Sequence, residues 1–148
     1  IERAFEFCER NSGSILDFAG GTGGYSIFFA SRGKDVTFFD SNIMQYNWMM
    51  WVSKKRNLGI KVYRNINDLK DKKFDFVLAS DIVEHVLDPG SLMKFLTSLI
   101  NKGGGMFASE LNMPGPDEIA PMHFKVEQKD GGILYNLEEN MKTLTRAR

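Results

Sequence analysis

The chain has 148 residues, enough for one domain, and a domain of this size buries about 68–70% of the surface of its unfolded chain. Hydrophobic residues make up 43% of the sequence and charged residues 26%, which excludes a disordered, collagen-like or disulfide-rich protein. Basic and acidic residues are equal at 19 each, so no net charge draws the chain toward nucleic acid or an anionic membrane. We therefore expect no nucleic acid and no membrane as partners.

The N-terminal residues and the cysteine content indicate the cellular compartment to expect. The single cysteine, Cys8, can form no internal disulfide, which favours a reducing, cytoplasmic setting. The first ten residues are charged and amphipathic where a secretory signal would be apolar, and no apolar run reaches the roughly 18 residues of a membrane span. Because the sequence starts at Ile1 inside a helical pattern and lacks an initiator Met, we expect a piece of a longer protein.

Short apolar runs alternate with amphipathic segments along the chain. The runs are β-branched or aromatic and almost continuously apolar, as in parallel strands buried on both faces. Five strands are expected, over 14–20, 35–40, 60–66, 74–80 and 104–110. Four helical segments separate them, three of which are helices over 22–32, 42–57 and 89–100. This alternation predicts an α/β fold with a doubly wound, mainly parallel sheet.

The helix expected over 42–57 carries several large apolar side chains. Met44, Trp48 and Trp51, together with Val52, recur at helical spacing. Such a stripe is more often core than part of a cofactor site, so we expect these side chains to pack on the sheet.

A glycine-rich loop, Asp-Phe-Ala-Gly-Gly-Thr-Gly-Gly over 17–24, follows the first strand, where glycines let the backbone approach a ligand closely. Asp40 ends the second strand 17 positions after Gly23, close to the roughly 20-residue spacing of a ribose-binding carboxylate. The alternatives are a tight turn without a ligand, and an Asp40 that caps the helix near Asn42. Ser26 stands where a dinucleotide-binding loop requires Gly or Ala, which weakens the case for a nicotinamide-dependent oxidoreductase.

The segment FDFVLASDIVEHVLDP (74–89) adds a more specific signal. An Asp-ended strand that runs into an E-H turn and then D-P resembles the corresponding motif of class I S-adenosylmethionine-dependent methyltransferases. ILDFAGGTGG (15–24), VTFFD (36–40) and NKGGGMFAS (101–109) match the same family in the same order. The resemblance implies a Rossmann-like methyltransferase fold, S-adenosylmethionine as cofactor, and methyl transfer as the reaction.

The resemblance also assigns cofactor-binding residues. It implies that the methionine part of the cofactor is surrounded by Asp17, Ala19, Gly21 and Gly23, and that Asp40 holds the ribose. Ala19 occupies the position of the family's usual first glycine.

Four further positions complete the implied site. Asn65 and Ile66, at the end of the third strand, match positions that usually face adenine, although many family members have Asp where Asn65 stands. Ser80 and Asp81, after the fourth strand, would close the site below the methyl group.

A sulfonium methyl group is already electrophilic, so catalysis requires alignment and exclusion of water, with a base where the acceptor carries a proton. The chain has two histidines, His85 and His123, and each follows a strand end on the ligand side of the sheet. Both are candidate bases, with a structural role in the turn as the alternative for His85. Asp81 and Glu84 together with these histidines would also suit a divalent metal ion, but no metal site is predicted.

The C-terminal part, 111–148, departs from the family pattern. Three of the four prolines lie in 112–122, which predicts a loop over the cofactor mouth, and the nearby Met113, Met122 and Phe124 favour a small-molecule acceptor. The 38 residues after Glu110 are too few for the family's remaining elements, although a hairpin over 123–137 is possible.

These observations predict a single methyltransferase domain over 1–148, with its cofactor-binding half over 1–110 and a sheet that is truncated or atypical after the fifth strand. An unpaired fifth strand could recruit a second copy or a missing chain segment. A nicotinamide-dependent oxidoreductase and a non-catalytic methyltransferase-like binding module remain as alternatives.

Overall fold

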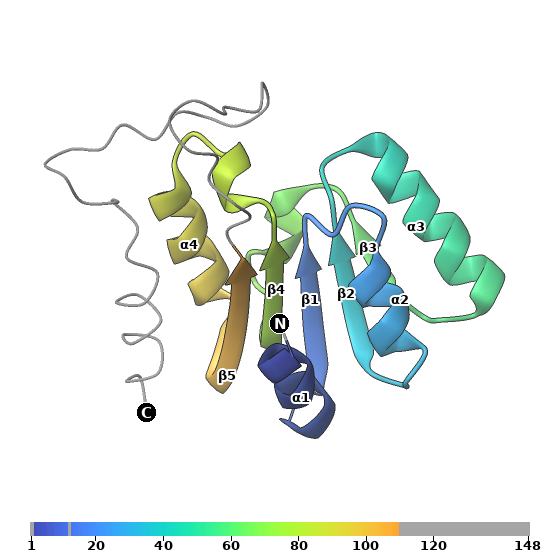
Figure 1. Cartoon of the computed structure of the whole chain (residues 1–148). Coiled ribbons are helices and arrows are strands. Elements are labelled where there is room, and N and C mark those ends of the chain that lie inside the picture. The colour runs from blue at the N-terminus through green and yellow to red at the C-terminus, as the bar shows by residue number, and fades with distance from the viewer. Residues whose placement is uncertain (1, 12, 110–148) are drawn as a thin grey trace, which may run out of the picture.

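A computed structural model describes residues 2–11 and 13–109, and Figure 1 shows its single sheet with helices on both faces. The strands are β1 (Ser14–Phe18), β2 (Asp35–Phe39), β3 (Lys61–Tyr63), β4 (Phe74–Ser80) and β5 (Ile100–Ser109). Their order is β3-β2-β1-β4-β5, and every neighbouring pair is parallel. The predicted doubly wound parallel sheet is confirmed.

One helix, α1 (Glu2–Asn11), precedes the first strand, and the others connect consecutive strands. They are α2 (Gly24–Ala30), α3 (Ile43–Arg56) and α4 (Pro89–Ser98), with the short 3₁₀ helices η1 (Ile66–Leu69) and η2 (Val83–His85). The helical segment expected between the third and fourth strands is therefore the four-residue η1. Side chains from α1, α2 and α3 pack with Ile15 on one face of the sheet, and side chains from α4 and η1 pack with Leu16 on the other. Alternation along β1 thus feeds both halves of the core.

Local capping fixes the ends of α3. The Asn42 side chain accepts a hydrogen bond from the Met44 backbone N–H at 2.9 Å, which begins the helix. Asn57 adopts a left-handed conformation at φ 52°, which ends it. The predicted helix over 42–57 is confirmed, with its first and last residues acting as the caps.

The predicted inner face of α3 is wrong. Met44, Trp48 and Trp51 are exposed, whereas Met49 and Val52 are buried against the sheet. Met49 and Val52 are also apolar at helical spacing, so the apolar pattern of this helix fits either face. Val52 is the one member of the predicted stripe that packs as expected.

The fifth strand begins earlier than expected, at Ile100. Its pairing with β4 shifts register between Phe74 and Phe76, so that Ile100 lies opposite Phe74 and Gly105 opposite Phe76. Gly103, inside the shifted segment, has a φ of 83°. The glycines of this strand therefore accommodate a bulge, which period-two patterning does not reveal.

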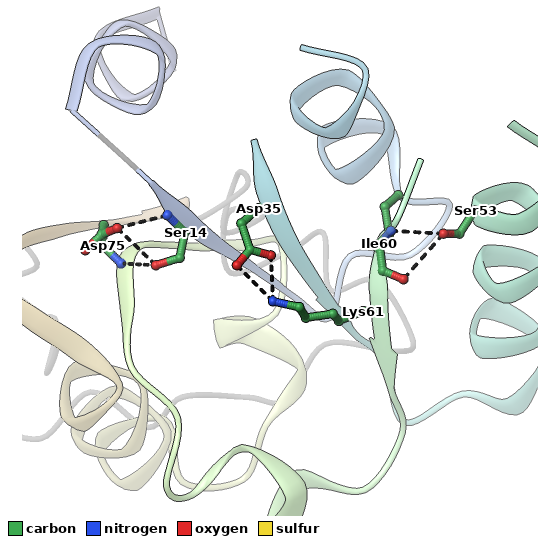
Figure 2. A network of polar contacts seen from close by, with 6 residues as sticks. All are labelled: Ser14, Asp35, Ser53, Ile60, Lys61 and Asp75. Carbon is green, nitrogen blue, oxygen red and sulfur yellow. Dashed lines mark hydrogen bonds and ion pairs between the residues drawn. The ribbon is translucent and has the colours of Figure 1, made fainter. Parts of the chain in front are cut away.

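Polar contacts hold the amino edge of the sheet together (Figure 2). The Asp75 carboxylate accepts hydrogen bonds from the Ser14 backbone N–H at 2.9 Å and from the Ser14 hydroxyl at 3.0 Å. Lys61 forms an ion pair with Asp35 at 2.8 Å. The Ile60 N–H donates to the buried Ser53 hydroxyl of α3 at 3.0 Å. These contacts lie away from the carboxyl edge, where the loops form the candidate site.

Within 2–11 and 13–109, no helix is long and apolar enough to cross a membrane. The loop predicted over 112–122 and the hairpin predicted over 123–137 lie outside the described residues.

Candidate functional site

The strand order changes direction at β1, which pairs with β2 on one side and with β4 on the other. In an open α/β sheet, the loops that leave the carboxyl ends of the strands at this point diverge and leave a crevice for a ligand. The glycine-rich segment over 17–24 runs from the last two residues of β1 to the first residue of α2. The topology therefore places the predicted glycine loop at the expected ligand-binding position.

The glycines of this loop are required for different reasons. A Cβ on Gly20 would meet the Phe38 ring at 2.6 Å, and a Cβ on Gly23 would meet Met49 at 1.7 Å. Gly21 has a φ of 55°, but a Cβ there would meet nothing within 4 Å. Gly20 and Gly23 thus permit packing beneath the loop, whereas the backbone at Gly21 is open on its outer side and can be approached by a ligand.

Ala19 adopts the same left-handed backbone region, with a φ of 55°. This conformation costs an L-residue with a side chain about 1–2 kcal/mol relative to the right-handed region. The geometry explains why a glycine is usual at this position in the family, and it shows that the alanine of this chain follows the same path.

Asp40 connects the end of β2 to the glycine loop. Its Oδ2 accepts a hydrogen bond from the Gly21 N–H at 3.1 Å, and its Oδ1 accepts one from the Asn42 N–H at 2.9 Å. The α3 cap is Asn42, so Asp40 does not fill the capping role that was its structural alternative. Each carboxylate oxygen keeps a further lone pair, which is enough to accept hydroxyl groups of a ligand.

Asp17 lies buried beneath the same loop, with 2% of its surface exposed. Its Oδ2 accepts hydrogen bonds from the Ser26 hydroxyl at 2.7 Å and from the Ser26 N–H at 3.1 Å. Burial, against the opposing effect of the two Ser26 hydrogen bonds and with a smaller contribution from the nearby Asp40 charge, raises the pKa of Asp17 from 3.8 to about 6. Ser26 therefore has a defined role as the partner of a buried carboxyl group.

A cavity of about 580 Å³ opens at the carboxyl ends of the strands. Three residues assigned by the resemblance, Ala19, Asn65 and Ile66, line it together. Ser41, which follows Asp40, lines it as well. The remaining lining residues are Phe18, Phe39, Arg64, Ile82, Val86 and Leu92. The walls are mainly apolar, with a few polar groups, as is usual for a small-molecule site.

Asn65 has a local structural role at the cavity wall. Its side-chain oxygen accepts a hydrogen bond from the Asn67 N–H at 3.0 Å and so caps η1. The amide nitrogen takes no part in that bond and is the group left to donate to a ligand.

Ser80 is the last residue of β4 and Asp81 follows it, so both lie at the carboxyl edge of the sheet. Neither residue lines this cavity. Asp81 is exposed and adopts a left-handed φ of 57°.

Of the two candidate histidine bases, the structure describes only His85. His85 ends η2 and is half-buried, and His123 lies outside the described residues. Among the side chains that the structure describes, no group of three or more His, Cys, Asp or Glu could hold a metal ion. Two of the four side chains in the alternative metal-binding set, those of Glu84 and His123, lie outside the described part of the structure.

Two residues of α3 support the glycine loop and were missed from the sequence. The Trp48 indole N–H donates to the Thr22 carbonyl at 3.1 Å. Met49 fills the space that a side chain on Gly23 would need. A signal was present, since a glycine required for packing implies a bulky neighbour, but the sequence does not show which helix supplies it.

A doubly wound parallel sheet with a glycine loop at its switch point and an acidic residue after β2 defines a Rossmann-like domain. A family model described as "Methyltransferase domain" matches residues 1–143, and the chain belongs to this family. The predicted class of protein is confirmed. The family match favours a methyltransferase over the alternative of a nicotinamide-dependent oxidoreductase.

Curated relatives agree with this assignment. The chain is 29% identical over 154 residues to a ubiquinone/menaquinone biosynthesis C-methyltransferase of Haemophilus ducreyi, covering 93% of this chain and 58% of the relative. It is 29% identical over 103 residues to a ubiquinone biosynthesis O-methyltransferase of Acinetobacter baylyi, covering 66% and 43%. The chain thus spans about half the length of these relatives.

Solved structures share the fold. A coclaurine N-methyltransferase bound to N-methylheliamine and S-adenosylhomocysteine (SAH) superposes with a TM-score of 0.62 at 23% identity, over 72% of this chain and 34% of that one. A protein from Pyrococcus horikoshii gives a TM-score of 0.64 at 22% identity, over 74% and 52%. At these identities the likeness establishes the fold.

Proposed function

We propose that the chain binds S-adenosylmethionine at the carboxyl edge of its sheet and transfers the methyl group to a small-molecule acceptor. The observation that carries the proposal is the cavity lined by Ala19, Asn65 and Ile66 beside the Gly21–Asp40 contact. The cavity residues come from separate segments of the chain, and their near neighbours Asp40 and Gly21 are hydrogen-bonded to each other, which supports a nucleoside-type ligand at this edge of the sheet.

The residues suit the cofactor. The cavity volume of about 580 Å³ falls within the roughly 300–1,000 Å³ of small-molecule sites, and its apolar walls suit a flat adenine ring. Ile66 would face the ring, and the Asn65 amide would donate to its edge. Asp40 would accept the ribose hydroxyls, because its Oδ2 already accepts from the Gly21 N–H of the loop and each of its oxygens keeps a further lone pair.

The methionine part would lie along the loop, against the open backbone of Gly21. Gly23 and Ala19 set the course of the loop through their left-handed conformations. The Asp17 carboxyl group would favour the positively charged ammonium group through space, since it is buried below the loop. Ser80 and Asp81 would border the methyl-bearing end from the β4 side.

The bound cofactor supplies an electrophilic sulfonium methyl group, so the residues of the chain have limited chemistry to perform. They hold the acceptor in line with the methyl group and exclude water from the mainly apolar cavity. Where the acceptor atom carries a proton, His85 or His123 would remove it as a general base. No metal ion is needed for these steps.

Several features support a small-molecule acceptor in a cytoplasmic protein. The curated relatives are named for ubiquinone and menaquinone biosynthesis, and a structural neighbour is named for coclaurine. Apolar residues concentrate near the proposed site, and the sequence has one cysteine, which excludes an internal disulfide. Among the residues that the structure describes, β5 is an edge strand, so the proposal includes a homo-oligomer or pairing with a further chain segment.

Calorimetric titration with SAH and, in parallel, with NADH tests the cofactor. We expect SAH to bind with a stoichiometry of one and NADH not to bind. Incubation with methyl-labelled S-adenosylmethionine and pooled small-molecule extracts then tests turnover. Binding of SAH without transfer to any pool would favour a non-catalytic module, and binding of NADH alone would overturn the proposal.

A further inference from the structure

The outer face of α3 carries large apolar side chains that no other part of the described structure covers. They are Met44 (72% exposed), Trp48 (46%), Met50 (47%) and Trp51 (51%). They lie opposite the face through which Met49 and Val52 pack on the sheet. A surface helix normally keeps a polar outer face, so α3, which is apolar on both faces, has a second surface that calls for a partner.

Trp48 and Trp51 form the centre of this face. Their rings stack with centroids 5.3 Å apart, one helical turn from each other. The Lys55 ammonium group lies 4.4 Å from the centroid of the Trp51 ring. The sequence contains two tryptophans, so both of them are placed on this face.

Positive charge adjoins the apolar side chains. Lys54, Lys55 and Arg56 form the last turn of α3, and all three are exposed. The 14 residues of the helix include no acidic side chain. The expectation of no membrane partner was based on the net charge of the whole sequence, which is zero. A net charge does not show a local excess of basic residues such as this one.

We propose that Met44, Trp48, Met50 and Trp51, with Lys54 and Lys55, form a surface that docks the protein on an anionic lipid membrane. Tryptophan favours the boundary between headgroups and acyl chains, and a helix with an apolar face and basic residues lies in the plane of that boundary. Each basic residue near an anionic surface adds about 1 kcal/mol of attraction. The α3 face offers both kinds of group together.

The charges favour a lipid surface over a second copy of the chain. Pairing α3 with α3 would bring two basic helix ends together without an acidic residue on either helix to neutralise them. An anionic membrane neutralises these charges and covers the apolar side chains at once. The Trp48 hydrogen bond to Thr22 joins this face to the glycine loop, so docking would hold the mouth of the candidate site close to the lipid.

Tryptophan fluorescence tests the proposal directly, because both reporters lie on the proposed surface. The whole chain is titrated with vesicles of phosphatidylcholine mixed with phosphatidylglycerol, and with vesicles of phosphatidylcholine alone. We expect a blue shift of the emission and co-sedimentation with the anionic vesicles, weakened by added salt. Lys54→Glu combined with Lys55→Glu should lower the partition coefficient by about tenfold or more.

Met50→Gln combined with Trp51→Gln should lower the partition coefficient by a similar factor, about tenfold, because it removes buried apolar area at the interface. Leu87→Gln is the matched control, since Leu87 is 84% exposed but lies outside the α3 face, and its binding should equal that of the wild type. Unchanged SAH affinity in the α3 variants would show that they are folded. If the apolar pair does not fold, the exposed lysine pair decides the question.

Three results would overturn the proposal: no vesicle-dependent shift in the wild type, equal partition of the wild type and the lysine variant, or equal binding to the two kinds of vesicle. A sedimentation-velocity dimer that Met50→Gln with Trp51→Gln abolishes, without vesicle binding by the wild type, would assign this face to contacts between copies instead.

Discussion

The Asp40 carboxylate accepts a hydrogen bond from the Gly21 N–H at 3.1 Å across 19 residues of sequence. This contact joins the end of β2 to the loop that follows β1. Residues next to both of these segments line a cavity whose other walls come from three further segments, around 64–66, 82–86 and 92. The same carboxylate also accepts a hydrogen bond from the Asn42 N–H at 2.9 Å, next to the start of α3. Asp40, which directly follows β2 in the sequence, therefore holds the glycine loop in place at the candidate site.

Gly23→Ala should destabilise the fold. The new Cβ would meet Met49 at 1.7 Å, and the alanine backbone would have to keep a φ of 74°. Overpacking costs about 1–3 kcal/mol and the left-handed conformation about 1–2 kcal/mol, so we expect a loss of about 2–5 kcal/mol in the free energy of unfolding. Urea denaturation followed by circular dichroism measures this change.

Gly24→Ala is the matched control for this substitution. Gly24 begins α2 without a positive φ, and a Cβ there would meet nothing within 4 Å. Alanine at this position should leave the protein as stable as the wild type or stabilise it by up to about 1 kcal/mol. Equal losses for the two variants would contradict the packing argument.

Asp17→Asn should change how stability depends on pH. Because the pKa of Asp17 is raised from 3.8 to about 6, the folded state binds a proton more tightly than the unfolded state. The stability that this group contributes is therefore present at low pH and falls as the pH rises through about 6. The change amounts to about 3 kcal/mol at 1.36 kcal/mol per pKa unit.

The variant lacks this titration, so its stability relative to the wild type should rise by about 3 kcal/mol between pH 4 and pH 7. Chemical denaturation of both proteins at several pH values across this window provides the comparison. A difference between the two proteins that does not vary with pH would show that Asp17 titrates normally in the folded state.

Asp75→Ala should weaken the amino edge of the sheet. The Asp75 carboxylate accepts four hydrogen bonds, from the Gly13 and Ser14 N–H groups, the Ser14 hydroxyl and the Asn101 amide. Removing the carboxylate leaves these partly buried donors without their acceptor, at a cost of about 1–3 kcal/mol. Asp35→Ala, which breaks the exposed ion pair with Lys61, should cost less than about 1 kcal/mol. Thermal unfolding compares the two variants, and a larger loss for Asp35→Ala would contradict this ranking.

The contribution of Asp75 should also disappear in acid. The Asn101 hydrogen bond first, and then that of the Ser14 N–H, lower the pKa of Asp75 below its usual 3.8. A depressed pKa stabilises the folded state above 3.8, and this stabilisation is lost as the pH falls through the folded-state value. The gap in stability between the wild type and Asp75→Ala should therefore narrow below pH 3.8, as measured by denaturation at pH 7 and near pH 2.

The strands and the glycine loop were predictable because they depend on local patterns. Continuously apolar runs identify buried parallel strands, and a loop rich in glycine after the first of them marks the ligand edge. Asp40 followed from its distance to that loop. These signals belong to short stretches of sequence, and the fold then brings them together by a topology common to such sheets.

The face of α3 and the walls of the cavity were not predictable in the same way. Met49 and Trp48 are both large, apolar and adjacent, so periodicity alone does not reveal which one is buried. Arg64 and Leu92 line the cavity from distant elements, and no sequence spacing relates them. Such features depend on tertiary packing, which propensity and pattern do not encode one residue at a time.

The measurement that tests the central claim most directly is calorimetric titration of SAH into the wild type, Asp40→Asn and Ile66→Arg. Asp40→Asn keeps the shape of the side chain but removes the charge beside Gly21, and Ile66→Arg places a long cation on the cavity wall. We expect the dissociation constant to rise by about tenfold or more in each variant, while Leu87→Gln binds as the wild type does. Wild-type affinity in both variants, with their folds intact, would place the cofactor elsewhere and contradict the proposed site.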